Sequence, residues 1–155
     1  MKGCKICLVF GTRPEGIKLA PVIKEIEKRI GVESLVVNTG QHREMLAHVL
    51  ELFKISSHYD LELMTKNQTL PDLTAKAISL LSEIFRKEAV DVVVVQGDTT
   101  TAFSAALAAF YLKIPVAHVE AGLRTFDKYS PFPEEVNRKL IAGIADWHFA
   151  PTVYS

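Results

Sequence analysis

The chain has 155 residues, a length that suits one domain with a single hydrophobic core. Hydrophobic residues make up 48% of it and charged residues 23%, which is typical of a globular protein and argues against extended disorder. Lys plus Arg and Asp plus Glu number 18 each, so the overall charge indicates neither a nucleic-acid partner nor an anionic membrane.

The first predicted element is a buried strand at residues 5–10. This apolar run is too short for the core of a signal peptide and far too short to span a membrane, so we expect a cytoplasmic protein. Cys4 and Cys7 form a C-x-x-C pair at this strand, but no second Cys or Cys/His pair follows at zinc-site spacing. We therefore expect no metal and interpret both cysteines as small hydrophobic residues of the strand region; redox chemistry is the less favoured alternative.

Helical and strand-like patterns alternate through the rest of the chain. Apolar residues at helical spacing predict helices at 22–30, 45–53, 73–85 and 99–112, and one that begins near Pro133. Short apolar runs predict further strands at 34–37, 91–95 and 115–119, with another candidate at 147–150. The segment 54–71 has no clear period and holds either a short strand or a loop. This alternation predicts an α/β fold with a doubly wound, Rossmann-like parallel sheet.

Polar clusters directly follow four of the predicted strands. They are GTRPEG at 11–16, NTGQH at 38–42, QGDTT at 96–100 and EAGLRT at 120–125. In an open parallel sheet the carboxyl ends of the strands share one edge, where ligands bind. We therefore expect all four loops to form one site for a small anionic ligand.

The first of these loops has the features of an anion-binding turn. Gly11 permits a sharp turn from strand to helix, where backbone N–H groups can meet an anion, and Arg13 and Lys18 add positive charge. Two common phosphate motifs are absent, since there is no G-x-G-x-x-G and residues 11–18 lack the GK[ST] ending of a P-loop. A nicotinamide enzyme and an ordinary ATPase are therefore disfavoured, while a solvated turn stays the alternative for this loop taken alone.

Acidic residues are the candidates for catalysis. Asp98 is placed where a helix should begin, so an N-cap is its structural alternative. Glu120 ends a strand and should face the ligand crevice, whereas Glu134 and Glu135 open a helix, where acids also suit the helix dipole. Carboxylates crowded in a cleft repel one another, which raises a pKa toward the range useful for proton abstraction. His118 shares a strand face with Glu120, but a partly buried structural histidine is the favoured interpretation.

Taken together, GTRPEGIKLAP, TGQH, QGDTTT, HVEAGLRT and PFPEEVNR strongly resemble the non-hydrolysing UDP-N-acetylglucosamine 2-epimerases. The resemblance runs in order along nearly the whole chain. It implies interconversion of UDP-N-acetylglucosamine and UDP-N-acetylmannosamine without a cofactor, by elimination of UDP and its re-addition. It also implies the first half of a two-domain fold like that of the glycosyltransferase-B enzymes.

The resemblance also implies roles for individual residues. It gives acid–base or sugar-side roles to Asp98, Glu120 and Glu134. It places a second group at the substrate, namely Arg13, Lys18, Gly11, Thr12 and Arg138. Gln41 and His42 match a region that lies beside a regulatory nucleotide-sugar site in some family members, so they are candidate regulatory residues.

Members of that family are longer than this chain, so the resemblance implies that residues 1–155 form an N-terminal Rossmann-like domain. A second domain, absent from these residues, would bind UDP, and the isolated chain would then have little or no activity. The resemblance further implies a UDP-sugar substrate, a homodimer of the full-length enzyme and a role in cell-surface polysaccharide biosynthesis, with no nucleic-acid or membrane partner. Two alternatives stay open, a non-catalytic nucleotide-sugar-binding or assembly module and half of a glycosyltransferase of the same fold.

Overall fold

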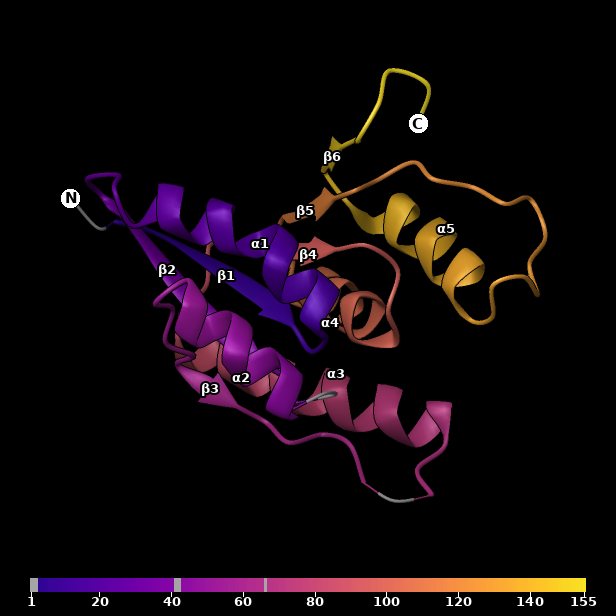
Figure 1. Ribbon diagram of the computed structural model, residues 1–155, viewed down its shortest axis with the longest axis horizontal. Helices are drawn as coiled ribbons and strands as arrows, with labels where there is room; N and C mark the ends of the chain where they lie inside the picture. The colour runs from indigo at the N-terminus through magenta and orange to yellow at the C-terminus, as the bar shows by residue number, and fades with distance from the viewer. Residues whose placement is uncertain (1–2, 41–42, 66) are drawn as a thin grey trace.

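The computed structural model describes residues 3–40, 43–65 and 67–155. Within these residues the protein forms a parallel sheet with helices on both faces (Figure 1). The strands are β1 (Cys4–Phe10), β2 (Val32–Asn38), β3 (Tyr59–Asp60), β4 (Val92–Gln96), β5 (Val116–Val119) and β6 (Trp147–Phe149). The helices are α1 (Arg13–Ile26), α2 (Arg43–Leu52), α3 (Leu70–Lys87), α4 (Thr100–Tyr111) and α5 (Glu134–Ile144).

The strand order is β3-β2-β1-β4-β5-β6, and each neighbouring pair is parallel. From β1 the chain first moves outward to β3, then returns to the other side of β1 and continues to β6. The order therefore reverses between β1 and β4, which is the arrangement of a Rossmann-like doubly wound sheet. The predicted fold class is confirmed.

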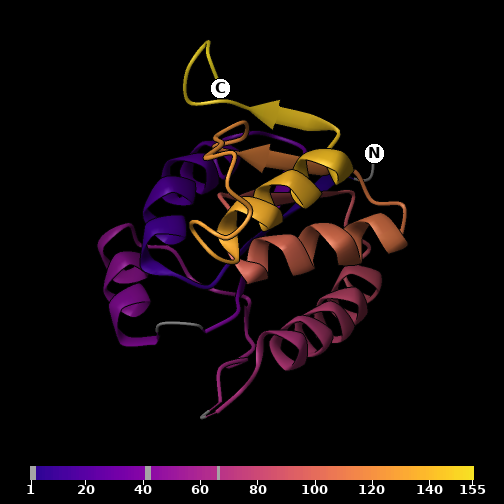
Figure 2. The ribbon, with the colours of Figure 1, turned by 90° about the vertical axis from the view of Figure 1, so that its right-hand side faces the viewer.

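The two faces of the sheet carry separate halves of the core. Leu8 and Phe10 of β1 pack with α1 and α2, whereas Cys7 and Val9 pack with α3 and α4. This follows from the alternation of side chains along a strand. Figure 2 shows the resulting three layers, with α1 and α2 on one side of the sheet and the other three helices opposite.

The C-x-x-C pair lies in β1. Cys7 is fully buried and Cys4 is exposed, and both are free thiols. Burial raises the pKa of the Cys7 thiol far above its usual value, so this sulfur stays protonated. The interpretation of the pair as part of the first strand region is confirmed.

Several boundaries differ from the prediction, most of all those of the first helix, which was predicted at 22–30 and spans Arg13–Ile26. The first helix ends at Ile26, and Ile30, which was predicted to lie on its apolar face, is fully exposed. The chain turns at Gly31, whose φ of +82° suits glycine, and β2 begins directly after it. The irregular segment 54–71 contains the short strand β3, one of the two structures expected there, and the last residues of the segment begin α3.

Candidate active site at the reversal of strand order

A cavity of about 480 Å³ lies at the carboxyl ends of β1, β4 and β5. Three of the four predicted loops supply its lining, which consists of Thr12, Arg13, Pro14, Glu15, Lys18, Gln96, Gly97, Asp98, Thr99 and Glu120. Ligands of open α/β sheets bind at such a reversal of strand order, because the loops on either side diverge there. This cavity is the candidate active site.

The described residues of the second predicted loop, 38–40, do not line this cavity, which corrects the expectation of one site for them. Asn38 and Gly40 line a separate cavity of about 460 Å³ together with Asp60 and Glu62. The reason is topological, since β2 lies on the far side of β1 from β4 and its loop opens toward β3. The candidate regulatory residues Gln41 and His42 lie outside the described residues.

Lys18 and Glu120 form an ion pair at the mouth of the cavity. The Lys18 Nζ atom lies 2.7 Å from Oε1 and 2.6 Å from Oε2 of Glu120. Gln96, at the end of β4, also donates its side-chain N–H to Glu120. Glu120 follows β5 directly with a φ of +63°, and its carboxylate is held by groups from α1 and from the end of β4. The cation of α1 and the acid that follows β5 are thus brought together, although 102 positions separate them in the chain.

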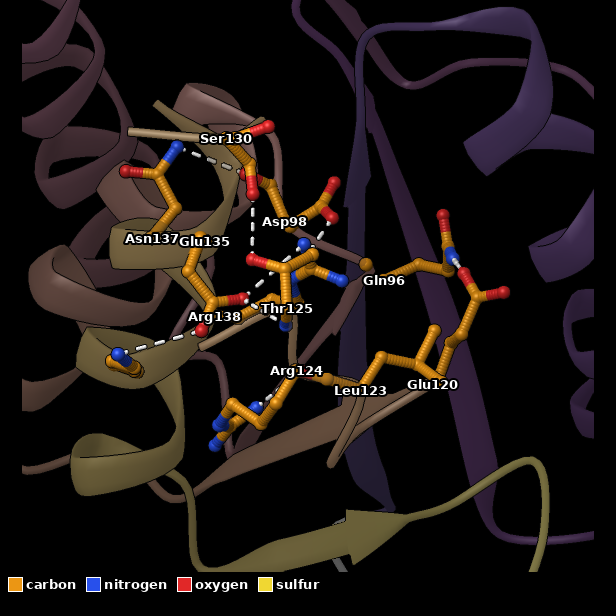
Figure 3. A network of polar contacts seen from close by, with 12 residues as sticks. Gln96, Asp98, Glu120, Leu123, Arg124, Thr125, Ser130, Glu135, Asn137 and Arg138 are labelled. Carbon is orange, nitrogen blue, oxygen red and sulfur yellow. Dashed lines mark hydrogen bonds and ion pairs between the residues drawn. The ribbon is translucent and has the colours of Figure 1, made fainter. Parts of the chain in front are cut away.

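Asp98 faces the cavity from the loop between β4 and α4 and contacts α5 on its other side (Figure 3). Its Oδ2 atom lies 3.4 Å from Nε of Arg138, and its backbone oxygen accepts a 2.9 Å hydrogen bond from Asn137. Burial raises the pKa of Asp98, Arg138 opposes that rise, and the nearby Glu134 and Glu120 reinforce it. A carboxylate with a raised pKa is a stronger base and so a better acceptor for a substrate proton.

Asp98 is not the N-cap of α4, which was the structural alternative for it. Thr99 occupies that position and accepts a 3.0 Å hydrogen bond from the backbone N–H of Ala102. The Asp98 side chain is thereby left free to point toward Arg138.

Glu134 and Glu135 differ sharply in environment. Glu134 lines a smaller cavity of about 190 Å³ that shares Thr99 with the main one, and its Oε2 atom is buried without a hydrogen-bond partner among the described residues. Glu135 is fully buried and accepts the backbone N–H groups of Thr125 and Phe126 at 3.0 and 3.3 Å. Glu135 therefore anchors the loop between β5 and α5, while Glu134 lies beside the main cavity.

Arg138 was expected to bind substrate, but the structure places it behind the cavity wall. The residue is 7% exposed, and its Nη2 atom lies 3.5 Å from Oε2 of Glu135 while Nε faces Asp98 (Figure 3). In this arrangement Arg138 acts on the site through Asp98. Its direct contact with substrate stays a prediction.

The backbone N–H groups expected to meet an anion at the first loop are already occupied. Those of Gly11 and Thr12 donate to Oε2 of Glu15 at 2.9 and 2.8 Å. The Thr12 side chain and the exposed Arg13 still line the cavity, so the positive charge of this loop comes from side chains. Sequence reasoning missed Glu15 as a site residue, although T-x-x-E at 12–15 is the pattern of a helix capping box.

His118 is fully buried, and its Nε2 atom lies 2.6 Å from the backbone oxygen of Gly97. Burial lowers its pKa, so the ring is neutral and donates from Nε2. The geometry agrees with the favoured structural interpretation, since the histidine holds the residue that precedes Asp98.

Residues 3–40, 43–65 and 67–155 hold neither a metal-ligand cluster nor a membrane-spanning helix. No group of three or more His, Cys, Asp or Glu residues there could hold a metal ion. No helix in that part of the chain is long and apolar enough to cross a membrane.

The fold and the cavity define the class of this protein, an α/β domain with paired acids and cations at the reversal of its strand order. The fold alone is shared with the MurG protein of Acinetobacter baumannii, at a TM-score of 0.66 and 17% identity. The sequence model of the UDP-N-acetylglucosamine 2-epimerase family matches residues 24–155, and the chain belongs to that family.

Individual relatives agree with this assignment. The UDP-N-acetylglucosamine 2-epimerases of Neisseria meningitidis and Bacillus subtilis are 55% and 53% identical to it over 148 and 152 residues, which are 96% and 98% of this chain. The crystal structure of the Neisseria meningitidis enzyme bound to UDP-GlcNAc superposes with a TM-score of 0.94 over 97% of the chain. The Methanocaldococcus jannaschii enzyme in complex with UDP-GlcNAc and UDP is 40% identical, with a TM-score of 0.90 over 97% of the chain. The chain spans only 40% of the length of the two bacterial relatives and 41% of the archaeal structure.

Proposed function

We propose that this chain is the N-terminal, acid-bearing domain of an enzyme that interconverts UDP-N-acetylglucosamine and UDP-N-acetylmannosamine. The observation that carries the proposal is the cavity where Lys18 and Glu120 pair beside Asp98. The names of the relatives support it, as do their structures with UDP-GlcNAc bound. A second domain, as long as the part of the relatives that this chain does not match, would supply most of the contacts to UDP.

The proposed reaction is elimination followed by addition. A carboxylate takes the proton from C2 of the sugar, the electrons of that bond form a C1–C2 double bond, and the C1–O bond to UDP breaks. UDP then adds back to C1 while an acid returns a proton to the opposite face of C2. Inversion at C2 needs proton-transfer groups on both faces of the sugar, and Asp98, Glu120 and Glu134 are the acids that share this work. Elimination and addition together leave the oxidation state of the sugar unchanged, so the reaction uses no nicotinamide.

Positive charge near the cavity would stabilise the departing diphosphate. Arg13 and Lys18 both line the cavity and are exposed, so their cations can reach a bound ligand. Charge that develops on a leaving oxygen is stabilised most by cations already held in place. Lys18 meets this condition, because Glu120 and α1 position it before a ligand binds.

The proposal extends to the setting of the complete enzyme. It would act as a homodimer in the cytoplasm and supply cell-surface polysaccharide biosynthesis, as the resemblance to the family implies. Its partner would be the UDP-sugar, with no nucleic acid and no membrane.

The decisive experiment restores a second domain. We would replace the matching segment of the Neisseria meningitidis relative by this chain and follow UDP-N-acetylglucosamine by proton NMR in D₂O. We expect UDP-N-acetylmannosamine with deuterium at C2, and a fall in kcat of about a hundredfold or more in Glu120→Gln, since general acid–base catalysis contributes on that scale. Glu83→Gln, on an exposed position of α3, is the matched control and should retain full kcat.

Three outcomes would contradict the proposal in different ways. A folded chimaera that binds UDP without epimerising the sugar would refute the activity. Full turnover in Glu120→Gln would remove that acid from the mechanism. Robust epimerisation by the 155 residues alone would remove the need for a second domain, and calorimetry of that chain with UDP-N-acetylglucosamine tests for a non-catalytic binding module. Transfer of the sugar to an acceptor would identify a glycosyltransferase instead.

A further inference from the structure

Glu15 is a buried acid that contacts the loop after β1 and the loop after β4, on either side of the reversal of strand order. It is 1% exposed, although it stands in the first turn of a helix whose start borders an open cavity. Its Oε2 atom accepts the backbone N–H groups of Gly11 and Thr12, and its Oε1 atom accepts the Thr99 hydroxyl at 2.6 Å. One carboxylate thus joins the loop after β1 to the loop after β4.

The direction of these hydrogen bonds is determined by their neighbours. Thr99 Oγ1 already accepts the backbone N–H of Ala102, so its single proton is available for Glu15. The two backbone groups can only donate. Glu15 therefore acts as an acceptor in all three contacts, at the N-terminal ends of α1 and α4 together. Burial raises its pKa, and the hydrogen bonds from Thr99, Gly11 and Thr12 oppose that rise.

Apolar packing does not hold these two helix ends together. α1 belongs to the core on one face of the sheet and α4 to the core on the other, so the sheet separates them along their length. Their N-terminal ends meet at the cavity, where Thr12 is followed by Arg13 and Asp98 is followed by Thr99. In each loop, Glu15 therefore forms its hydrogen bond at the residue next to a candidate ligand-binding or catalytic side chain.

We propose that Glu15 is a positioning residue that sets the separation between the cations of α1 and Asp98 across the reversal of strand order. This inference rests on the proposed function, because its catalytic consequence is the alignment of the acid with the leaving diphosphate. Loss of the Glu15 hydrogen bonds would let the two loops move independently. A displacement of about 1 Å in a catalytic group can cost up to about a hundredfold in rate, so the effect would fall on kcat.

The test measures kcat and KM in the chimaera with the Neisseria meningitidis segment. Glu15→Gln keeps the shape of the side chain but replaces one acceptor oxygen by an N–H₂ group, and we expect kcat to fall about tenfold to a hundredfold with KM within about twofold. Thr99→Val removes the hydroxyl and should have the same effect. The double variant should be no slower than either single variant, because both changes break the same contact.

Two controls separate positioning from loss of a helix cap or of stability. Thr99→Ser retains a hydroxyl that can cap α4 and donate to Glu15, so it should recover most of the kcat that Thr99→Val loses. Leu81→Ala changes a fully buried position of α3 that lines none of the cavities described above, and it should lower the melting temperature without changing kcat.

The outcomes distinguish this inference from the proposed function. If the parent chimaera epimerises the sugar but Glu15→Gln keeps its kcat, or if the losses of the two single variants add in full, the positioning role is overturned. If the parent chimaera is inactive, the proposed function fails. Amide NMR of the 155-residue chain still tests whether Glu15 links the loop after β1 to the loop after β4. In that spectrum Glu15→Gln should shift the Asp98 and Thr99 amide resonances, and changes confined to residues 11–16 would refute this link.

Discussion

Buried carboxylates in this protein behave differently according to the groups around them. Within the described residues, no hydrogen bond contributes to the pKa of the Asp98 carboxyl group; burial raises this pKa, and the charge of Arg138 opposes the rise. Asp98 is only partly buried, whereas Glu135 is fully buried, and the backbone N–H of Thr125 leads the contacts that hold the pKa of Glu135 below the usual range. Asp98 is therefore suited to exchanging a proton, whereas Glu135 is suited to remaining ionised as an anchor.

Glu135 should accordingly make stability depend on pH. Its folded-state pKa lies below its unfolded value of about 4.3, so its contribution is present above that pH and is lost as pH falls through the folded pKa. We expect Glu135→Gln to lower the free energy of unfolding at pH 7, with a difference that shrinks as the pH falls below about 4. Urea titrations across this range would measure it.

The exposed Glu83 of α3 provides the matched control, because Glu83→Gln makes the same chemical change at the surface. A deficit in Glu135→Gln that stayed constant down to pH 2, or one that Glu83→Gln reproduced, would contradict this assignment.

At the scale of elements, α5 brings three polar contacts to the site within little more than one turn. Glu135 holds the loop before the helix, Asn137 holds the Asp98 backbone and Arg138 faces the Asp98 side chain (Figure 3). One apolar residue of α5, Ile141, belongs to the fully buried core on the α4 side of the sheet. The placement of these polar groups therefore depends on how Ile141 packs.

We expect Ile141→Ala to reduce the free energy of unfolding by about 2–5 kcal/mol, the usual cost of a cavity left by a buried isoleucine. Leu140→Ala, at a neighbouring position that is 45% exposed, should cost less than about 1 kcal/mol. Equilibrium unfolding in urea compares the two variants. Equal losses would show that α5 is not held by its buried face.

At the scale of the whole molecule, the sheet has a rigid centre and an exposed edge. Val9 of β1 and Val93 of β4 are fully buried, whereas each of the three residues of β6 is exposed. Local opening is easiest where little apolar surface is buried and one strand edge is free. The candidate active site lies over this buried centre, at the carboxyl ends of β1, β4 and β5.

Hydrogen exchange should follow this gradient. We expect the amide protons of β1 and β4 to exchange last, at rates set by global unfolding, and those of β6 to exchange orders of magnitude sooner. Exchange measured by NMR on the 155-residue chain checks the order. Protection of β6 equal to that of β1 would mean that another part of the molecule covers this edge.

The sequence alone was sufficient for the architecture and for the edge of the sheet that carries the site. Strand and helix patterns are local, so the alternation from residue 5 to residue 149 could be predicted, and each polar cluster could be located after its strand. The helix predicted to reach Ile30 was wrong at its end, because one exposed isoleucine fits a helical period as well as a buried one does. The family resemblance rested on motifs that are visible in the sequence.

Only the tertiary structure decided which polar groups are partners. Thr99 and Glu15 are 84 positions apart, and no spacing in the sequence predicts their hydrogen bond. The T-x-x-E pattern at 12–15 does indicate that Glu15 accepts the N–H of Thr12, one of the groups that an anion was expected to meet. The strand order likewise separates the loop at Asn38 from the cavity, and the packing of α5 places Arg138 behind Asp98. Local sequence patterns reflect which residues are buried. Hydrogen-bond partners depend instead on which strand ends, with their loops, the sheet brings together.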